Sequence, residues 1–342
     1  MRVAVIHGGT SSEHDVSVAS GEGIADGLRR AGHDVVPVLV DRAGEWHTPY
    51  GAGRLVAVDT LLGCDVAVPA LHGVLGEDGT VQGFLDVLGV RYVGSPVAAS
   101  AVCLDKQLTK LVVAGAGVPV APGVLVPVDR ARAATCSAVE LDRVAADLAA
   151  AGLVGPVFVK PVHGGSSIGV TRIATTGPPD LARALGAALE AGSDSVLVEA
   201  EVCGLEVDVP VLELPDGEVR CGPSLLVQSD PDEPFFTEAA KYASGATRFA
   251  VPAPLGTELT EHLERLAATA YRALGCRGLA RVDFLVGSEG PVLNEVNTFP
   301  GFTPASQFPR MWAAAGIGYP ALVDLLVRTA STASVGAVAA RP

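Results

Sequence analysis

Glu295 and Asn297 interrupt a segment, VLNEVNTFPGFT (residues 292–303), that otherwise has the composition of a buried strand. Side chains alternate between the two faces of a strand, so Leu293, Glu295 and Asn297 are expected on one face. A carboxylate and an amide oxygen are costly on an apolar face unless a partner satisfies them. A hard cation, which takes oxygen ligands, is such a partner, so this spacing indicates a metal site.

The preceding strand, LARVDFLV (residues 279–286), is joined to this one by GSEGP, a turn signal, so the two segments are predicted to form a hairpin. If Val286 pairs with Val292 across the turn, Asp283 lies opposite Glu295. Two carboxylates that close repel each other unless a cation bridges them. The hairpin therefore favours a cation site.

The same register places Arg281 opposite Asn297, which gathers two carboxylates, an amide oxygen and a guanidinium on one face. Mg²⁺ suits this set, because it keeps several waters and takes further ligands from nucleotide phosphates. The alternative is an ion-pair cluster at a domain edge. We favour magnesium, and the predicted ligands are Asp283, Glu295 and Asn297.

Lysine is rare in this chain: of 24 basic residues, 20 are arginine and only four are lysine, namely Lys106, Lys110, Lys160 and Lys241. A chain with this bias is expected to keep lysine where a compact ammonium matters, for instance against phosphate oxygens. The alternative is that the four lysines are chance survivors on the surface. Their surroundings decide between the two interpretations.

Two loops carry lysines into candidate phosphate sites. Lys160 ends the strand-like VFVK and precedes a Gly-Gly-Ser-Ser turn, in which backbone N–H groups can approach phosphate oxygens and Ser166 and Ser167 add hydroxyl donors. The turn lacks the P-loop pattern, and an ordinary flexible hairpin is the alternative. Lys241 and Tyr242 lie in a long polar loop that is typical of a lid, with an incidental exposed lysine as the alternative.

The elements that must position these residues begin with an alternation of strand-like and helix-like segments over the first hundred residues. This pattern predicts an α/β layered domain with an open, mainly parallel sheet. A ligand is expected at the carboxyl ends of its strands, where HGGTSSE and LHGVLGEDGT lie. The acids and histidines of these loops, taken singly, are typical of helix caps: Glu13, His14, His72, Glu77 and Asp78.

From about residue 104 the pattern changes to shorter, mixed helices and strands, among them an Ala-rich helix at 131–151 and a helix at 256–274. The last residues, RTASTASVGAVAARP, are predicted to be a frayed tail. The predicted domains are residues 1–103, 104–200 and 201–330, with 331–342 outside the last domain.

Composition narrows the classes of protein. The 342-residue chain is 49% hydrophobic and 18% charged, as globular chains are, and its net charge of −14 argues against general nucleic-acid binding. The longest apolar run, LVVAGAGVPVAPGVLVPV, is interrupted by prolines and glycines, so no membrane span is predicted. The N-terminus lacks a signal-peptide layout, and six cysteines without CxxC spacing indicate reduced thiols in a cytoplasmic protein.

Taken together, the motifs resemble the D-alanine–D-alanine ligase family of the ATP-grasp superfamily. The resemblance runs nearly end to end, through GGTSSEHDVS, LHGVLGEDGTVQG, LDKQLTK, VFVKPVHGGSSIGV, VEAEVCGLEV, AAKY, GLARVDF and LNEVNTFPGFT. It implies an ATP-grasp fold, in which the N-terminal α/β domain is followed by two α+β domains that clasp ATP. It also implies D-alanine and ATP as substrates, two Mg²⁺ ions with Mn²⁺ as an alternative, and a homodimer. The implied product is D-alanyl-D-alanine for peptidoglycan synthesis, formed through a D-alanyl phosphate.

The resemblance also implies roles for single residues. The catalytic positions of the family match Glu13, Ser166, Tyr242, Arg281 and Gly301. Its ATP-binding positions match Lys106, Lys160, Ser167, Glu199, Val202, Glu206 and Lys241. Its substrate contacts match Glu13, His72, Arg281, Gly301 and Ser306, and its magnesium ligands match Asp283, Glu295 and Asn297. In this scheme Glu13, Ser166 and Tyr242 form a hydrogen-bonded trio that closes a lid.

The second substrate is less closely defined. Gln307 stands where a leucine is usual beside it, Ala200 stands where a lysine often contacts the base, and SSEHDVSV, GCRGLARVD and FPRMWAAAGI are similar to the glycopeptide-resistance ligases. Tyr242 is present, however, and its loop lacks the histidine of the lactate-using enzymes, which favours a dipeptide product. D-lactate or D-serine as acceptor is one alternative. A nucleotide-binding module without catalysis is another, and the presence of Arg281 argues against it.

Overall fold

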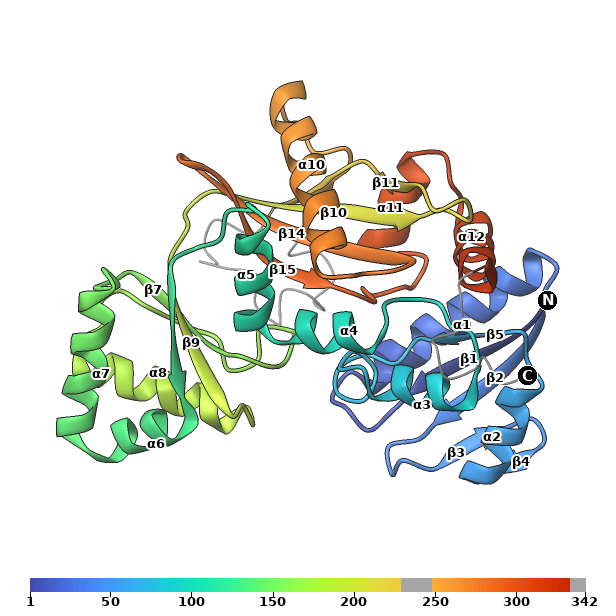
Figure 1. The fold of residues 1–342 in the computed structure, drawn as a ribbon, viewed down its shortest axis with the longest axis horizontal. Helices are drawn as coiled ribbons and strands as arrows, with labels where there is room; N and C mark the ends of the chain where they lie inside the picture. The colour runs from blue at the N-terminus through green and yellow to red at the C-terminus, as the bar shows by residue number, and fades with distance from the viewer. Residues whose placement is uncertain (229–247, 333–342) are drawn as a thin grey trace.

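The computed structural model describes residues 1–228 and 248–332. These residues form three separate β-sheets, each accompanied by helices (Figure 1). In Figure 1 the central sheet lies at the left, the C-terminal sheet in the middle and the N-terminal sheet at the right. The mixed α/β architecture with several sheets agrees with the predicted fold class.

The N-terminal sheet is open, and its three longest strands are parallel, as predicted, whereas its two short strands pair antiparallel. Its strand order is β4-β3-β2-β1-β5, and β1 pairs in parallel with both β2 and β5. The strands are β1 (Arg2–Gly8), β2 (Asp34–Val40), β3 (Trp46–Thr48), β4 (Gly51–Ala52) and β5 (Val66–Pro69). The helices are α1 (His14–Arg30), α2 (Arg54–Leu62) and α3 (Thr80–Leu88). The central strand β1 is almost wholly apolar because it is buried on both faces.

The central sheet is antiparallel, with strand order β6-β9-β7-β8. Its strands are β6 (Gly123–Pro127), β7 (Val157–Pro161), β8 (Thr171–Ile173) and β9 (Ser195–Ala200). Its helices are α6 (Val128–Cys136), α7 (Ala138–Ala150) and α8 (Pro178–Glu190), and α4 (Val97–Leu104) and α5 (Lys106–Gly115) lead into it. The single helix predicted at 131–151 is wrong: Ser137 is extended and its hydroxyl caps α7, so two helices form.

The C-terminal sheet has the order β13-β12-β10-β14-β15, with β11 paired to β10. Its strands are β10 (Leu205–Glu213), β11 (Val219–Cys221), β12 (Leu225–Gln228), β13 (Arg248–Ala250), β14 (Leu279–Gly287) and β15 (Gly290–Asn297). Its helices are α10 (Thr257–Ala273), α11 (Gln307–Ala314) and α12 (Tyr319–Thr332). The predicted tail begins too early, because α12 continues through Arg328 and buries Thr329 and Ala330.

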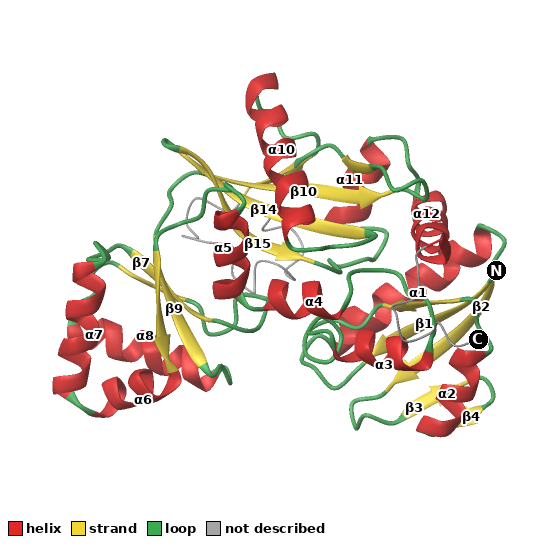
Figure 2. Ribbon diagram, in the orientation of Figure 1, coloured by secondary structure: helices red, strands yellow, loops and turns green. Residues whose placement is uncertain are grey.

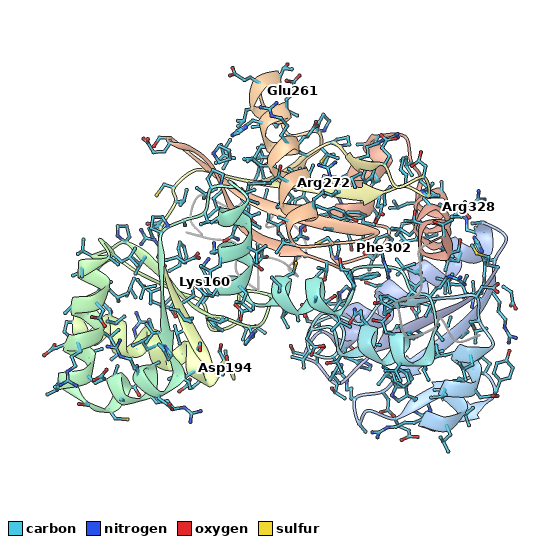
Figure 3. The ribbon with its side chains drawn as sticks, viewed as in Figure 1. Lys160, Asp194, Glu261, Arg272, Phe302 and Arg328 are labelled. Atoms are coloured by element: carbon cyan, nitrogen blue, oxygen red, sulfur yellow. The ribbon has the colours of Figure 1, made fainter. Side chains whose placement is uncertain are left out.

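The hydrophobic cores show how the three units are joined. One core combines residues of β1, β5 and α1 with Phe302, Phe308, Trp312 and the apolar face of α12, which lies beside α1 (Figure 2). Phe302 lies where the N-terminal and C-terminal parts meet (Figure 3). The core of the central sheet, in contrast, takes its buried residues only from positions 126 to 198 of the described chain.

All six cysteines lie in the described part of the chain and are unbridged. Among the described residues, no helix is long and apolar enough to cross a bilayer. The domain boundaries remain a prediction, although each sheet falls within one of the predicted ranges.

Candidate active site

The β14–β15 hairpin brings the predicted polar residues face to face. Arg281 pairs with Asn297 and Asp283 pairs with Glu295, as the sequence predicts. The register near the turn differs from the prediction, because Val286 pairs with Pro291 instead of Val292. The two halves of the hairpin are out of step by one residue, which is a β-bulge.

The extra residue of the bulge is Asn294, which lies between Leu293, paired with Phe284, and Glu295. Leu293 was predicted on the face of Glu295, and this is wrong: it is fully buried in the core together with Phe284 and Val296. Leu293 and Val296 are three residues apart, and two core residues at that spacing in a strand require an extra residue between them. That spacing was the sequence signal for the bulge.

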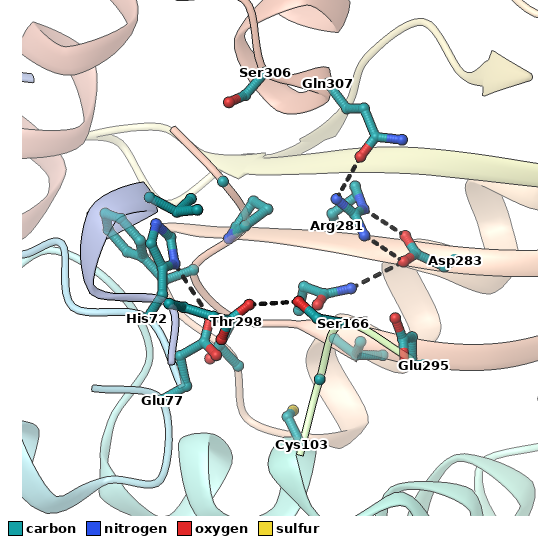
Figure 4. Close-up of a pocket in the computed structure, with 18 of the residues that line it drawn as sticks. His72, Glu77, Cys103, Ser166, Arg281, Asp283, Glu295, Thr298, Ser306 and Gln307 are labelled. Atoms are coloured by element: carbon teal, nitrogen blue, oxygen red, sulfur yellow. Dashed lines mark hydrogen bonds and ion pairs between the residues drawn. The ribbon is translucent and has the colours of Figure 1, made fainter. Parts of the chain in front are cut away.

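Arg281 is held from two sides inside the site (Figure 4). Its Nε and Nη2 donate to the two carboxylate oxygens of Asp283, both at 2.7 Å, and its Nη1 donates to Gln307 Oε1 at 2.8 Å. Burial disfavours the charge, but the carboxylates of Asp283 and Asp208 outweigh burial and raise the pKa of Arg281 above its ordinary value. The guanidinium is therefore charged and fixed in orientation.

Asp208, which was not among the predicted site residues, belongs to the same cluster. It pairs with Asp283 across β10 and β14, and its Oδ2 accepts from Gln307 Nε2 at 3.0 Å and lies 3.6 Å from Arg281 Nε. Its Oδ1 is buried and has no hydrogen-bond partner among the described residues. The available signal was an acid inside the apolar run VDVPVL (residues 207–212), where a carboxylate needs a partner as Glu295 does.

The predicted metal ligands Asp283, Glu295 and Asn297 all line one cavity. Two carboxylates and an amide form a donor set of hard oxygen atoms, which fits Mg²⁺. In the part of the chain that the structure describes, no three histidine, cysteine or acidic residues form a complete metal cage. The residues therefore suit an ion whose remaining ligands come from water or from a bound nucleotide.

The cavity has a volume of about 600 Å³ and is lined from all three units. The predicted site residues that line it are Glu13, His72, Lys106, Ser166, Glu206, Arg281, Asp283, Glu295, Asn297, Gly301 and Ser306. Four other predicted residues, all described, lie outside this lining: Lys160, Ser167, Glu199 and Val202. Lys241 and Tyr242 lie outside the described residues.

The amino-terminal wall of the cavity joins two units through a short hydrogen bond. Ser166 Oγ, in the loop after β7, donates to Glu13 Oε1 at 2.7 Å. The backbone at Ser166 and Ser167 is left-handed, with φ of 53° and 59°, a strained conformation that turns the loop toward Glu13. Two members of the predicted trio are thus in contact.

The remaining wall is built around His72 and Ser306. His72 is only 5% exposed, its Nε2 lies 3.1 Å from Ser20 Oγ, and its Nδ1 lies 3.7 Å from Glu77 Oε1. Ser306 precedes α11, and its hydroxyl lies 2.8 Å from Thr303 Oγ1 and accepts from Thr303 N at 3.0 Å. Both side chains line the cavity and are held in place by these neighbours.

The three described lysines converge on one region instead of scattering over the surface. Lys106 opens α5, where Asp105 caps the helix, and its Nζ donates to Gly164 O at 2.7 Å. Lys160 Nζ lies 2.5 Å from Glu199 Oε2, and Lys110 Nζ lies 2.6 Å from Glu199 Oε1. These three lysines are therefore not chance survivors on the surface, which was the alternative interpretation.

Glu199 was predicted to bind ATP; its side chain is only 2% exposed and is engaged by Lys110 and Lys160. Burial opposes its ionisation, but the two lysines outweigh burial and hold the pKa of Glu199 below its ordinary value. Burial also lowers the pKa of Lys106 and of Lys110, against the opposing attraction of nearby glutamates. The side chain of Glu199 therefore acts within the lysine cluster.

Sequence models of one family match most of the chain. The model described as D-ala D-ala ligase C-terminus matches residues 112–328, and the model described as D-ala D-ala ligase N-terminus matches residues 2–60 and 53–95. A curated D-alanine–D-alanine ligase from Corynebacterium aurimucosum is 41% identical over 96% of this chain and 97% of its own. One from Mycobacterium tuberculosis is 37% identical over 98% of this chain and 97% of its own.

Solved structures of two ligases superpose on nearly the whole chain. The VanG D-Ala:D-Ser ligase from Enterococcus faecalis superposes with a TM-score of 0.81 at 29% identity, over 96% of this chain and 99% of its own. The D-alanine–D-alanine ligase from Coxiella burnetii superposes with a TM-score of 0.76 at 28% identity, over 97% of this chain and 94% of its own.

Proposed function

This chain belongs to the D-alanine–D-alanine ligase family, and from that premise we propose that it joins two D-alanine molecules with ATP to give D-alanyl-D-alanine, ADP and phosphate. One observation supports this most directly. A single cavity gathers Glu13, Lys106, Arg281 and two carboxylates from three different units of the chain. An amino acid and a triphosphate need such a combination: an acid for the ammonium, cations for the negatively charged groups, and carboxylates, here Asp283 and Glu295, for a metal ion.

In the first step, a carboxylate oxygen of D-alanine attacks the γ-phosphorus of ATP and ADP leaves. Glu13 holds the ammonium of this D-alanine, and Ser166 holds Glu13 in place through its 2.7 Å hydrogen bond. Lys106 and Lys160 orient the phosphates and offset their charge. Asp283, Glu295 and Asn297 would hold Mg²⁺, which supplies charge neutralisation at the phosphate oxygens.

In the second step, the amine of the other D-alanine attacks the acyl carbon of D-alanyl phosphate, and phosphate leaves. Charge develops on the acyl oxygen, which Arg281 and the backbone N–H of Gly301 stabilise. Asp283 and Gln307 engage three of the five N–H groups of Arg281, so the guanidinium is already oriented before charge develops. Ser306 binds the carboxylate of the second D-alanine.

The first experiment measures phosphate release from ATP and Mg²⁺ with D-alanine alone, and then with added D-lactate or D-serine, with products separated by mass. We expect D-alanyl-D-alanine as the main product in every mixture. A mixed product as the main species would contradict the dipeptide assignment. The structural similarity to the VanG D-Ala:D-Ser ligase is the specific reason to include D-serine.

The acceptor choice also has a test at Tyr242, which lies outside the described residues. If Tyr242 closes the lid over the site, Tyr242→Phe should shift the product ratio from dipeptide toward the D-lactate ester. The ratio is measured by mass with both acceptors at equal concentration. An unaltered ratio would count against the role of Tyr242, without affecting the dipeptide assignment.

We further propose that the chain is a cytoplasmic homodimer whose product enters peptidoglycan synthesis. The absence of a bilayer-crossing helix among the described residues is compatible with this location. Light scattering coupled to gel filtration tests the dimer directly, and a monomer at micromolar concentration would contradict it.

A further inference from the structure

Lys110 is the only one of the three described lysines that has no role in the proposed function. It lies on α5, is 6% exposed, and places its Nζ 2.6 Å from Glu199 Oε1 and 3.3 Å from Leu293 O. A lysine this deeply buried is rare unless it is paired. Its contacts point to a function inside the protein, not at the surface.

Glu199 is shared between two lysines. Its Oε1 faces Lys110 and its Oε2 faces Lys160 Nζ at 2.5 Å, and Lys160 also donates to Asn294 Oδ1 at 3.3 Å. The charges of Lys110, Lys160 and Glu199, two ammonium groups and one carboxylate, sum to +1. Lys160 and Glu199 alone would form a neutral buried pair, which attracts an anion weakly.

We propose that Lys110 is a positioning residue for ATP: it satisfies the charge of Glu199, so that Lys160 keeps a net positive charge for the phosphates. This inference rests on the proposed role of Lys160 in the reaction. Lys110 also tethers α5 to the Leu293 carbonyl, next to the residue that receives the hydrogen bond of Lys160. The two lysines thus join α5, β7 and β9 to β15, which carries the predicted metal ligands Glu295 and Asn297.

The test compares three variants of the full chain: Lys110→Met, Glu199→Gln, and the double variant Lys110→Met/Glu199→Gln. The dissociation constant of ADP with Mg²⁺ is measured by calorimetry, and the KM values of ATP and D-alanine by phosphate release. Lys110→Met should weaken ADP binding and raise the KM of ATP by about tenfold or more, as expected when a buried charge pattern changes. The KM of D-alanine should stay within about twofold.

The double variant distinguishes a charge role of Lys110 from a packing role. It removes one positive and one negative charge, so Lys160 alone restores the net charge of +1. ADP affinity should therefore recover to within about threefold of the wild type, a coupling that a double-mutant cycle detects. If the double variant binds ADP as weakly as Lys110→Met, or more weakly, Lys110 has only a packing role and the proposal is wrong.

Two controls separate charge from folding. Arg130→Met removes one positive charge from α6, where Arg130 pairs with Glu140 and Asp147, and should leave the KM of ATP unchanged. Lys110→Arg keeps the charge, so it should bind ADP within about threefold of the wild type even if Lys110→Met does not fold. A tenfold loss in Lys110→Arg would contradict the charge argument.

The proposed function is tested separately by the Lys160→Met variant and by the product of the wild type. If Lys160→Met binds ADP as the wild type does, Lys160 does not contact phosphate, and the inference for Lys110 fails with it. If the wild type forms no D-alanyl-D-alanine but Lys110→Met still weakens ADP binding and the double variant restores it, the inference holds and the assigned reaction is wrong.

Discussion

At the scale of single residues, the orientation of Arg281 depends on an amide that cannot flip. Asp208 Oδ2 accepts from Gln307 Nε2, so Gln307 must turn its Oε1 toward Arg281 Nη1. The amide is neutral, and it therefore fixes the guanidinium without cancelling its charge. A third carboxylate at this position would orient Arg281 equally well but weaken its attraction for a developing oxyanion.

We expect Gln307→Met, which keeps the length of the side chain but removes both hydrogen bonds, to lower kcat by about 10- to 100-fold. This is the range expected for a hydrogen bond to a charged group, about 1.5–3 kcal/mol. ADP affinity should be unchanged, because Gln307 faces Arg281 and not the lysine cluster. Steady-state kinetics with a parallel ADP titration checks this, and a kcat within twofold of the wild type would refute the orientation argument.

The contact between Ser166 and Glu13 gives a second prediction at this scale. Ser166→Ala removes the 2.7 Å hydrogen bond, so Glu13 is held less firmly against the substrate ammonium, and we expect the KM of D-alanine to rise about tenfold. Ser167→Ala is the matched comparison, because Ser167 lies outside the cavity lining and is proposed to serve ATP. It should change the KM of ATP more than that of D-alanine, and equal effects from the two variants would argue against separate roles.

At the scale of elements, the bulge at Asn294 decides which residues of β15 face the core. Regular alternation would bury Val292 and turn Leu293 toward the cavity, whereas the bulge buries Leu293 and leaves Val292 partly exposed. The bulge therefore allows an apolar strand to present Glu295 and Asn297 to the cavity without exposing Leu293.

The bulge predicts unequal costs for two neighbouring truncations. Leu293→Ala should lower the free energy of unfolding by about 2–5 kcal/mol, because it empties a fully buried site. Val292→Ala should cost less than about 1 kcal/mol, because its side chain is only partly buried. Urea denaturation of both variants measures this, and the reverse order would show that the strand alternates without a bulge.

The contact of β1 with α1 makes stability depend on pH through His7. Burial lowers the pKa of His7 below its ordinary value of 6.5, and Gly21 in α1 packs so close to its ring that a β-carbon there would clash. The native state thus binds fewer protons than the unfolded state, so stability falls as pH drops below 6.5 toward the lowered pKa.

We expect the free energy of unfolding to fall more steeply between about pH 7 and pH 5 in the wild type than in His7→Gln, in which this proton is absent. The difference in slope is at most about 1.4 kcal/mol per pH unit for one proton. Urea denaturation at several pH values checks this, and parallel pH profiles would mean that His7 titrates normally in the folded protein.

At the scale of the whole molecule, the units differ in how far they depend on one another. One of the two cores at the N-terminal sheet is shared with Phe302, Phe308 and Trp312, and the other takes its buried residues only from positions 4 to 92. The described central core takes its buried residues only from positions 126 to 198. The cavity lies where all three units meet. If this cavity holds the substrates, as proposed, they lie between the units.

This difference predicts the behaviour of fragments. A fragment of residues 118–201 should fold on its own and unfold cooperatively, because its core is complete. A fragment of residues 1–103 should fold poorly, because the face of α1 that packs on α12 and Phe302 would be exposed to water. Circular dichroism and thermal unfolding of both fragments check this; stable, cooperative folding of residues 1–103 would contradict it.

The sequence by itself determined the local elements and the polar face of the hairpin. Alternation, turn residues and helix signals are properties of neighbouring residues, so the helix at 256–274 and the pairing of Asp283 with Glu295 could be predicted. The motifs also identified the family correctly, because its long motifs are contiguous in the chain. The roles of individual site residues remain predictions.

Only the tertiary structure decided which distant side chains meet. Asp208 and Gln307 are 99 positions apart, and Lys110 reaches the Leu293 carbonyl 183 positions away. Such contacts depend on how the sheets pack against one another, which no local pattern specifies. The same packing placed two lysines on the side chain of Glu199, and a buried carboxylate must find its partners wherever the fold brings cations to it.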